Sequence, residues 1–148
     1  MLNALTVDVE DYYHVQALAR VIHPSQWEDY PSRVATNTMR FLDLFDIRGI
    51  RATFLVLGWV AQRCPDLVRR IFAAGHQIGC HSYNHRLIYG GTQTISARIC
   101  AAPRDIEDII GVALTSFRAP SYSITAQTPW ALNVLGEEGF EYDSSIFP

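Results

Sequence analysis

The chain has 148 residues, of which 49% are hydrophobic, 11% aromatic and 18% charged. This content excludes a disordered chain, and the length is that of one domain covering residues 1–148. A formal net charge of −3 gives no reason to expect a nucleic-acid partner. No apolar run approaches the roughly 18 residues of a membrane span, so we expect a protein that is not integral to a membrane. No secretory signal precedes the first predicted strand, which predicts a cytoplasmic location.

Short β-rich runs alternate with helical patterns along the chain. Strands are predicted over residues 5–9, 52–57, 76–80, 114–117 and from 140, and helices from Ser32 to before Gly49, from Pro65 to before Gly75, over 94–110 and from Thr128 to 135. Ser32 and Thr128 are typical N-cap residues, and Pro65 suits a first helical position. Pro103 lies inside the third helical pattern, where we expect a kink or a restart. This alternation favours a parallel sheet with helices packed outside it.

Polar side chains suited to chemistry follow three of the predicted strands. They are Asp8, Glu10 and Asp11 after the first strand, His81 and His85 after the third, and Arg118 after the fourth. Because the carboxyl ends of parallel strands share one edge of a sheet, we expect these side chains to converge.

Two histidines four positions apart, His81 and His85, would lie on one face if their segment turned helically. Imidazole is a good ligand for zinc, cobalt, nickel or iron, and one carboxylate would complete an open three-ligand site. Either Glu10 or Asp11 offers that carboxylate. The alternative interpretation is two partly exposed histidines on a loop or helix face.

At the predicted sheet edge, Arg118 can orient the carboxylate of Asp8 through paired donors, which would let Asp8 act as a general base. Backbone N–H groups after Pro120 could stabilise an oxyanion. The competing interpretations are a solvated acidic loop and a surface arginine before an ordinary proline turn. Tyr12 and Tyr122 lie close in sequence to these residues, where aromatic rings would suit stacking on sugars, although such tyrosines are more often simply packed.

Three ordered motifs resemble those of the polysaccharide deacetylases of the NodB-homology type. They are Thr6–Asp11 (TVDVED), His81–His85 (HSYNH) and Arg118–Tyr122 (RAPSY). Residues 52–59, 74–79 and 142–148 also resemble the branch of that family associated with exosortase and exopolysaccharide loci. The similarity covers essentially the whole chain, and three motifs in order are far more specific than any one of them.

This resemblance implies an α/β fold, a distorted (β/α) barrel, whose members remove acetyl groups from the N-acetylated sugars of a polysaccharide. It also implies a divalent metal, most commonly Zn²⁺, held by one carboxylate and two histidines. Carried over residue by residue, His81 and His85 match the metal histidines, Asp8 matches the catalytic base, and Arg118 matches the arginine that orients this base.

The acidic motif departs from the commonest family pattern, in which two adjacent aspartates precede a glycine and the second binds the metal. Val9 occupies that second position here. By analogy with members that have an acid-x-acid pattern, Glu10 is the expected ligand and Asp11 the alternative. Ser121 stands where many members have tyrosine, a change that matters little if the oxyanion contact uses a backbone N–H. The residues expected to contact substrate are Tyr12, Pro120, Ser121 and Tyr122.

The family also has a later motif containing a leucine and a histidine that acts as general acid, and no histidine follows His85 in this chain. The resemblance therefore predicts a C-terminally truncated domain, with an incomplete barrel that lacks its last strands and turns over poorly or not at all. An unclosed barrel exposes a strand edge and an apolar face, which predicts marginal solubility or self-association.

Three other functions stay open on the sequence. The same ligand set would serve a metal-dependent hydrolase of small cyclic amides or other non-peptide C–N bonds. The missing acid would suit a non-catalytic glycan-binding remnant, whose sugar binding would survive Asp8→Asn and metal chelation. A metal-free α/β domain is the least specific alternative.

Overall fold

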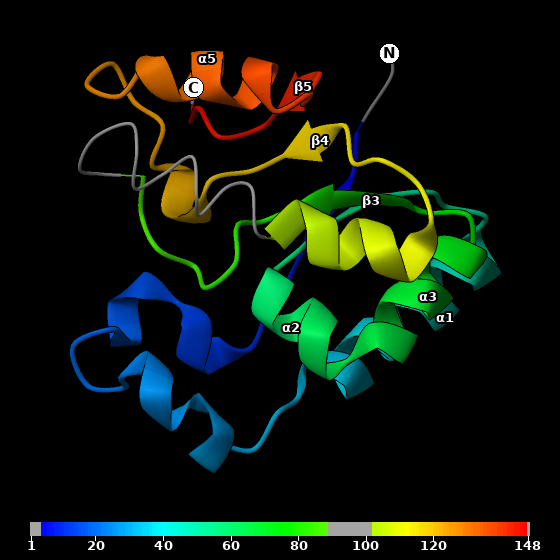
Figure 1. The fold of residues 1–148 in the computed structure, drawn as a ribbon. Helices are drawn as coiled ribbons and strands as arrows, with labels where there is room; N and C mark the ends of the chain where they lie inside the picture. The colour runs from blue at the N-terminus through cyan, green and yellow to red at the C-terminus, as the bar shows by residue number, and fades with distance from the viewer. Residues whose placement is uncertain (1–3, 89–101, 148) are drawn as a thin grey trace.

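The computed structural model describes residues 4–88 and 102–147 (Figure 1). Within them, five parallel strands form one sheet in the order β1-β2-β3-β4-β5. The strands are β1 (Thr6–Val9), β2 (Thr53–Val56), β3 (Gln77–Cys80), β4 (Ser116–Phe117) and β5 (Tyr142–Asp143). The predicted parallel sheet is confirmed, with strands shorter than the apolar runs that predicted them.

Helices connect the strands and cover one face of the sheet. They are α1 (Val34–Arg48), α2 (Gly58–Arg63), α3 (Pro65–Ala73), a helix over residues 102–110, and α5 (Trp130–Glu137). Buried apolar side chains join this face of the sheet (Phe54, Val56, Ile78) to α1 and α3 (Leu42, Phe45, Val68, Ile71). None of the described helices combines the length and apolarity that crossing a membrane requires.

Two helix starts differ from the prediction. The N-cap of α1 is Arg33, and the Ser32 hydroxyl donates to the carboxylate of Asp11 at 2.6 Å instead of capping the helix. The N-cap of α5 is Pro129, one residue after the predicted Thr128. Residues 94–101 of the predicted third helix lie outside the described residues, and Pro103 lies in the first turn of the part that is described.

A small lobe that the sequence did not predict lies between β1 and α1. Three short 3₁₀ helices build it, namely η1 (Tyr12–His14), η2 (Gln16–Leu18) and η3 (Pro24–Asp29), the blue segments of Figure 1. Tyr13, Ile22 and Trp27 form its own buried cluster. The ring of Trp27 meets that of Trp59 in α2 edge to face at 5.5 Å, which fixes the lobe beside the sheet.

The sheet is strongly curved, with one concave face. In a flat sheet β1 and β4 would lie three strand spacings apart, roughly 14 Å, too far for one side chain to bridge. Arg118, directly after β4, nevertheless donates to Thr6 and Asp8 of β1, at 2.7 Å in both cases. Gly79 permits this curvature, since a Cβ there would lie 2.8 Å from Cδ1 of Leu55 and 2.9 Å from the carbonyl oxygen of Ser116.

Candidate metal centre

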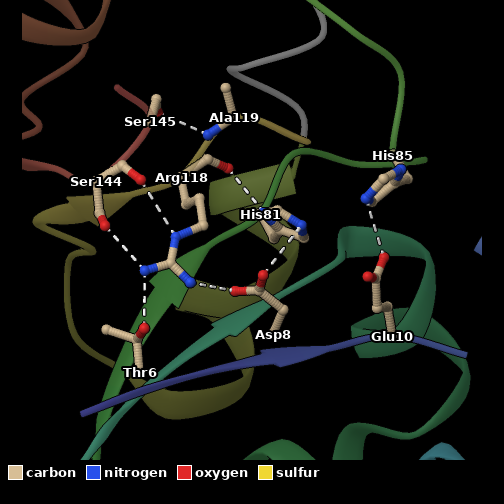
Figure 2. A network of polar contacts seen from close by, with 9 residues as sticks. All are labelled: Thr6, Asp8, Glu10, His81, His85, Arg118, Ala119, Ser144 and Ser145. Atoms are coloured by element: carbon tan, nitrogen blue, oxygen red, sulfur yellow. Dashed lines mark hydrogen bonds and ion pairs between the residues drawn. The ribbon is translucent and has the colours of Figure 1, made fainter. Parts of the chain in front are cut away.

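The carboxyl ends of β1, β3 and β4 bring the predicted polar residues together, as Figure 2 shows. Glu10, His81 and His85 each present a candidate ligand atom, and these atoms all lie within 4.8 Å of one another. The predicted convergence at this edge of the sheet is therefore observed. The group is buried or half-buried, which distinguishes it from an ordinary acidic surface cluster.

A loop, and not a helical turn, brings the two histidines together. His81 follows β3 directly, and the backbone then takes positive φ angles at Ser82 (63°) and His85 (53°). The imidazole rings end 5.2 Å apart between centroids, at an interplanar angle of 70°. The helical turn considered from the spacing is thus absent, but the proximity it was meant to explain is present.

The first turn of α2 holds this loop in place. The N–H of Gly58 donates to the carbonyl of Ser82, and the N–H of Trp59 to that of Tyr83, both at 2.9 Å. These N–H groups have no acceptor inside the helix, so the loop carbonyls satisfy them. A Cβ on Gly58 would lie 2.7 Å from the ring of Tyr83 and 2.9 Å from Cβ of Ala102, so glycine is needed for this close approach.

Glu10 and His85 lie within hydrogen-bond distance of each other. Nε2 of His85 lies 3.1 Å from Oε2 of Glu10, while Nδ1 of the same ring is buried with no hydrogen-bond partner among the described residues. Burial, with a smaller contribution from Asp8, raises the pKa of Glu10 to about 7. Burial, together with the neighbouring His81, lowers the pKa of His85 to about 4. A carboxyl group and an imidazole buried at this distance are both ligand types that a divalent cation binds.

His81 is fixed in the orientation that a metal ligand needs. Its Nδ1–H donates to the carbonyl of Arg118 at 2.8 Å, and because a carbonyl only accepts, this nitrogen carries the proton. The lone pair of Nε2 therefore faces the site, 4.0 Å from Oδ2 of Asp8. Burial of the ring lowers the pKa of His81, which favours the neutral form that binds metals.

Arg118 holds Asp8 by one oxygen and leaves the other free. Its Nη1 donates to Oδ1 of Asp8 at 2.7 Å, while Oδ2 faces the histidines. The guanidinium is itself held by Thr6 Oγ1 at 2.7 Å, by Ser144 Oγ at 2.8 Å and by the Ser144 carbonyl at 3.2 Å. We did not single out Thr6 or Ser144 from the sequence, although both lie in segments that resemble the family.

Asp11 has a structural role and lies outside the ligand group. Its carboxylate accepts hydrogen bonds from the Tyr13 hydroxyl at 3.1 Å, the Ser32 hydroxyl at 2.6 Å and the N–H of Arg33 at 2.8 Å. Asp11 thereby ties the end of β1 to the start of α1. Of the two carboxylates left open by the sequence, Glu10 is the one placed beside the histidines.

The turn after β4 has an unusual backbone conformation, which leaves one N–H group free to bind a ligand. Pro120 is buried in the 3₁₀ turn η4 (Pro120–Tyr122), where Ser121 and Tyr122 both have φ of 53°. The N–H of Tyr122 donates to the Ala119 carbonyl at 3.1 Å. The N–H of Ser121 has no acceptor among the described residues, so it is the donor after Pro120 that is available to a ligand.

The two tyrosines expected at the substrate rim occupy different places. Tyr122 is 39% exposed, and its ring lies 5.5 Å from the Arg118 guanidinium carbon and 5.7 Å from the ring of Phe147. Tyr12 packs under the guanidinium of Arg33 at 5.1 Å. Tyr122 therefore borders the site, whereas Tyr12 contacts Arg33 at the start of α1 and the ring of Tyr13 in η1.

Comparison with known proteins identifies relatives of this chain. The sequence pattern of the polysaccharide deacetylase family matches residues 25–140. The chain is 32% identical over 102 residues to the peptidoglycan-N-acetylglucosamine deacetylase PgdA of Listeria monocytogenes, covering 68% of this chain and 22% of that protein. It is 32% identical over 107 residues to a chitin deacetylase of Pestalotiopsis sp, covering 70% of this chain and 35% of that one.

A solved structure shares the fold. A Mycobacterium smegmatis protein, classed with the polysaccharide deacetylases, superposes with a TM-score of 0.78 at 29% sequence identity. The match covers 96% of this chain and 50% of the solved one. The chain thus spans only part of the length of each of these relatives.

Proposed function

We propose that this chain, which belongs to the polysaccharide deacetylase family, is a metal-dependent hydrolase that removes N-acetyl groups from an amino-sugar polymer. The observation that carries the proposal is the buried group of Glu10, His81 and His85 beside the Asp8–Arg118 pair. The names of two relatives, a peptidoglycan-N-acetylglucosamine deacetylase and a chitin deacetylase, support an N-acetylated glycan as the substrate class.

The donor set fits a divalent cation, with zinc the preferred ion. Two imidazoles and one carboxylate make an open three-ligand zinc site, and the buried Oε2 of Glu10 lies 3.1 Å from Nε2 of His85. A metal held there would polarise a carbonyl and lower the pKa of a water molecule towards about 7. Glu10, His81 and His85 are the residues that would hold it.

Asp8 is the proposed general base. Arg118 anchors its Oδ1, which leaves Oδ2 directed into the site to accept a proton from water. Because the guanidinium is held both by Thr6 of β1 and by Ser144, directly after β5, the carboxylate has little freedom to turn away. Arg118 therefore acts as a positioning residue for Asp8.

The acetyl oxygen needs a donor as negative charge develops on it. The N–H of Ser121 is the candidate, because the positive φ angles of this turn hold it in a fixed place without a competing acceptor among the described residues. A preorganised donor of this kind contributes about 3–4 kcal/mol to transition-state stabilisation. Tyr122, at the exposed rim, is placed to stack on a sugar ring.

Metal stoichiometry and deacetylation test this function together. We expect one zinc per chain by elemental analysis, lost in His81→Ala and in His85→Ala and retained in His23→Ala, whose side chain is exposed in η3's cap. Release of acetate from chitooligosaccharides would support the glycan substrate, and hydrolysis restricted to small cyclic amides would refute it. Unchanged zinc content in both histidine variants would refute the metal site.

We also propose that the curved sheet belongs to a distorted (β/α) barrel of the exosortase-associated branch, completed by strands beyond Pro148. Support comes from the reach of Arg118 across the concave face and from the partial coverage of the relatives. An apolar strand followed by Leu-x-x-His in the downstream coding sequence would bear this out.

A further inference from the structure

The peptide group that joins Arg118 to Ala119 is hydrogen-bonded at both ends (Figure 2). Its carbonyl oxygen accepts from Nδ1 of His81 at 2.8 Å, and its N–H donates to Oγ of Ser145 at 2.7 Å. The Ser145 hydroxyl in turn donates to Oδ1 of Asp143, and the Ser145 N–H donates to Oδ2 of the same carboxylate at 3.1 Å. A continuous chain of hydrogen bonds therefore runs from the His81 ring to the carboxylate of Asp143.

Every donor in this chain points in the same direction. A carbonyl only accepts, so His81 must donate to it, and a backbone N–H only donates, so Ser145 must accept from Ala119. The single hydrogen of the Ser145 hydroxyl is then left for Asp143. Hydrogen bonds aligned in this way polarise one another, by about 10–30% per bond.

The middle of this chain of hydrogen bonds is buried from solvent, and its end at Asp143 is exposed. Ala119 and Ser145 are both 0% exposed, and the His81 side chain is 2% exposed, so water does not compete with these contacts. Asp143 lies in the exposed strand β5. The negative charge of the exposed Asp143 carboxylate can therefore act on the buried His81 ring without being buried itself.

We propose that Asp143 and Ser145 are positioning residues that orient and polarise His81 as a metal ligand through the Arg118–Ala119 peptide bond. Metal-binding histidines usually donate their second nitrogen to a carboxylate or a carbonyl, which fixes the tautomer and raises ligand basicity. Here a carboxylate acts on the carbonyl through a serine and a peptide group. This proposal rests on the proposed function.

Zinc affinity of the full chain measures the effect. We would titrate metal-free protein with Zn²⁺ against a chromophoric chelator for the wild type and for Ser145→Ala, Asp143→Ala and Asp143→Asn. Ser145→Ala breaks the chain beside the peptide bond and should weaken zinc binding roughly 10–100-fold. Asp143→Ala should weaken it about tenfold, and Asp143→Asn by less, because asparagine keeps an acceptor for the serine hydroxyl.

Thr128→Val is the matched control. The buried Thr128 hydroxyl accepts from the N–H of Thr125 at 2.9 Å and donates to the Ser123 carbonyl at 3.3 Å, so its loss removes comparable hydrogen bonds, neither of which involves His81. We expect this variant to lose stability but to bind zinc within twofold of the wild type. With Co²⁺ in place of zinc, the visible spectrum should shift in Ser145→Ala and not in Thr128→Val.

The outcomes separate this proposal from the proposed function. Wild-type protein that binds no divalent ion would refute both. Zinc bound by the wild type, with Ser145→Ala or Asp143→Ala equally tight, would overturn the positioning role alone. If Ser145→Ala does not fold, the Asp143 variants decide the question, because their substituted side chain lies at the surface.

Discussion

Replacing Arg118 by lysine keeps the positive charge but removes the planar guanidinium group that reaches several acceptors at once. The guanidinium donates four hydrogen bonds, to Asp8, to Thr6 and twice to Ser144, and the residue is only 6% exposed. Each of these bonds has an ionised donor, and a bond of this kind is worth about 1.5–3 kcal/mol. A lysine ammonium can reach one or two of these acceptors, so at least two bonds are lost and we expect Arg118→Lys to lose about 3 kcal/mol or more of unfolding free energy.

Urea unfolding, followed by circular dichroism, measures this loss. The matched control is Arg51→Lys, because Arg51 is exposed and its hydrogen bond, to the Ile50 carbonyl, is long at 3.4 Å. We expect the control to change stability by less than about 0.5 kcal/mol. If Arg118→Lys also falls within this margin, Arg118 does not hold the edge strands together, and the argument for Asp8 orientation fails with it.

The other predictions concern curvature, ligand choice and pH. Gly79→Ala should lower the free energy of unfolding by about 1–3 kcal/mol, because the added methyl group would overpack against the Ser116 carbonyl. Gly136→Ala in α5 is the control, since a methyl group there meets open space and should not destabilise the protein in the same urea assay. Equal effects of the two substitutions would contradict the curvature argument. Glu10→Gln should abolish zinc uptake in chelator competition with little loss of stability. Asp11→Asn should bind zinc normally and lower the free energy of unfolding by about 1–2 kcal/mol, because it weakens the hydrogen bonds from Tyr13 and Ser32. The reverse pattern would make Asp11 the ligand. Because the pKa of Glu10 is raised to about 7, protons compete for its carboxylate below that pH, and zinc affinity should fall about tenfold per unit from pH 7 to pH 5.5; a flat profile would count against Glu10.

Much of the sheet could be predicted from the sequence, because its strands are apolar runs. Three of the four residues of Thr53–Val56 are buried and the run shows no alternation, which is typical of a parallel strand. The polar residues after three such runs then had to meet, since parallel strands end at one edge. Fold class and the location of the candidate site both follow from this single pattern.

The segments that could not be predicted are those in which the apolar residues show no helical or strand periodicity. The 3₁₀ helices between residues 12 and 29 are too short to show one, and α2 has six residues. The cap at Ser32 was predicted wrongly because a carboxylate 21 residues away, Asp11, takes the hydroxyl that local reasoning gave to the helix. Ser144 and Ser145 lie in a segment that resembles the family, but their contacts could not be predicted because their partners are distant in sequence.

The choice between Glu10 and Asp11 was, however, within reach of the sequence. Successive side chains of an extended strand point to opposite faces, so Thr6, Asp8 and Glu10 share one face, and Asp11 points to the other. Asp11 itself has an extended backbone, at φ −94° and ψ 160°. An acid-x-acid pattern at the end of a strand therefore puts the proposed base, Asp8, and the proposed ligand, Glu10, on one face, and it leaves Asp11 free for its contacts with the start of α1.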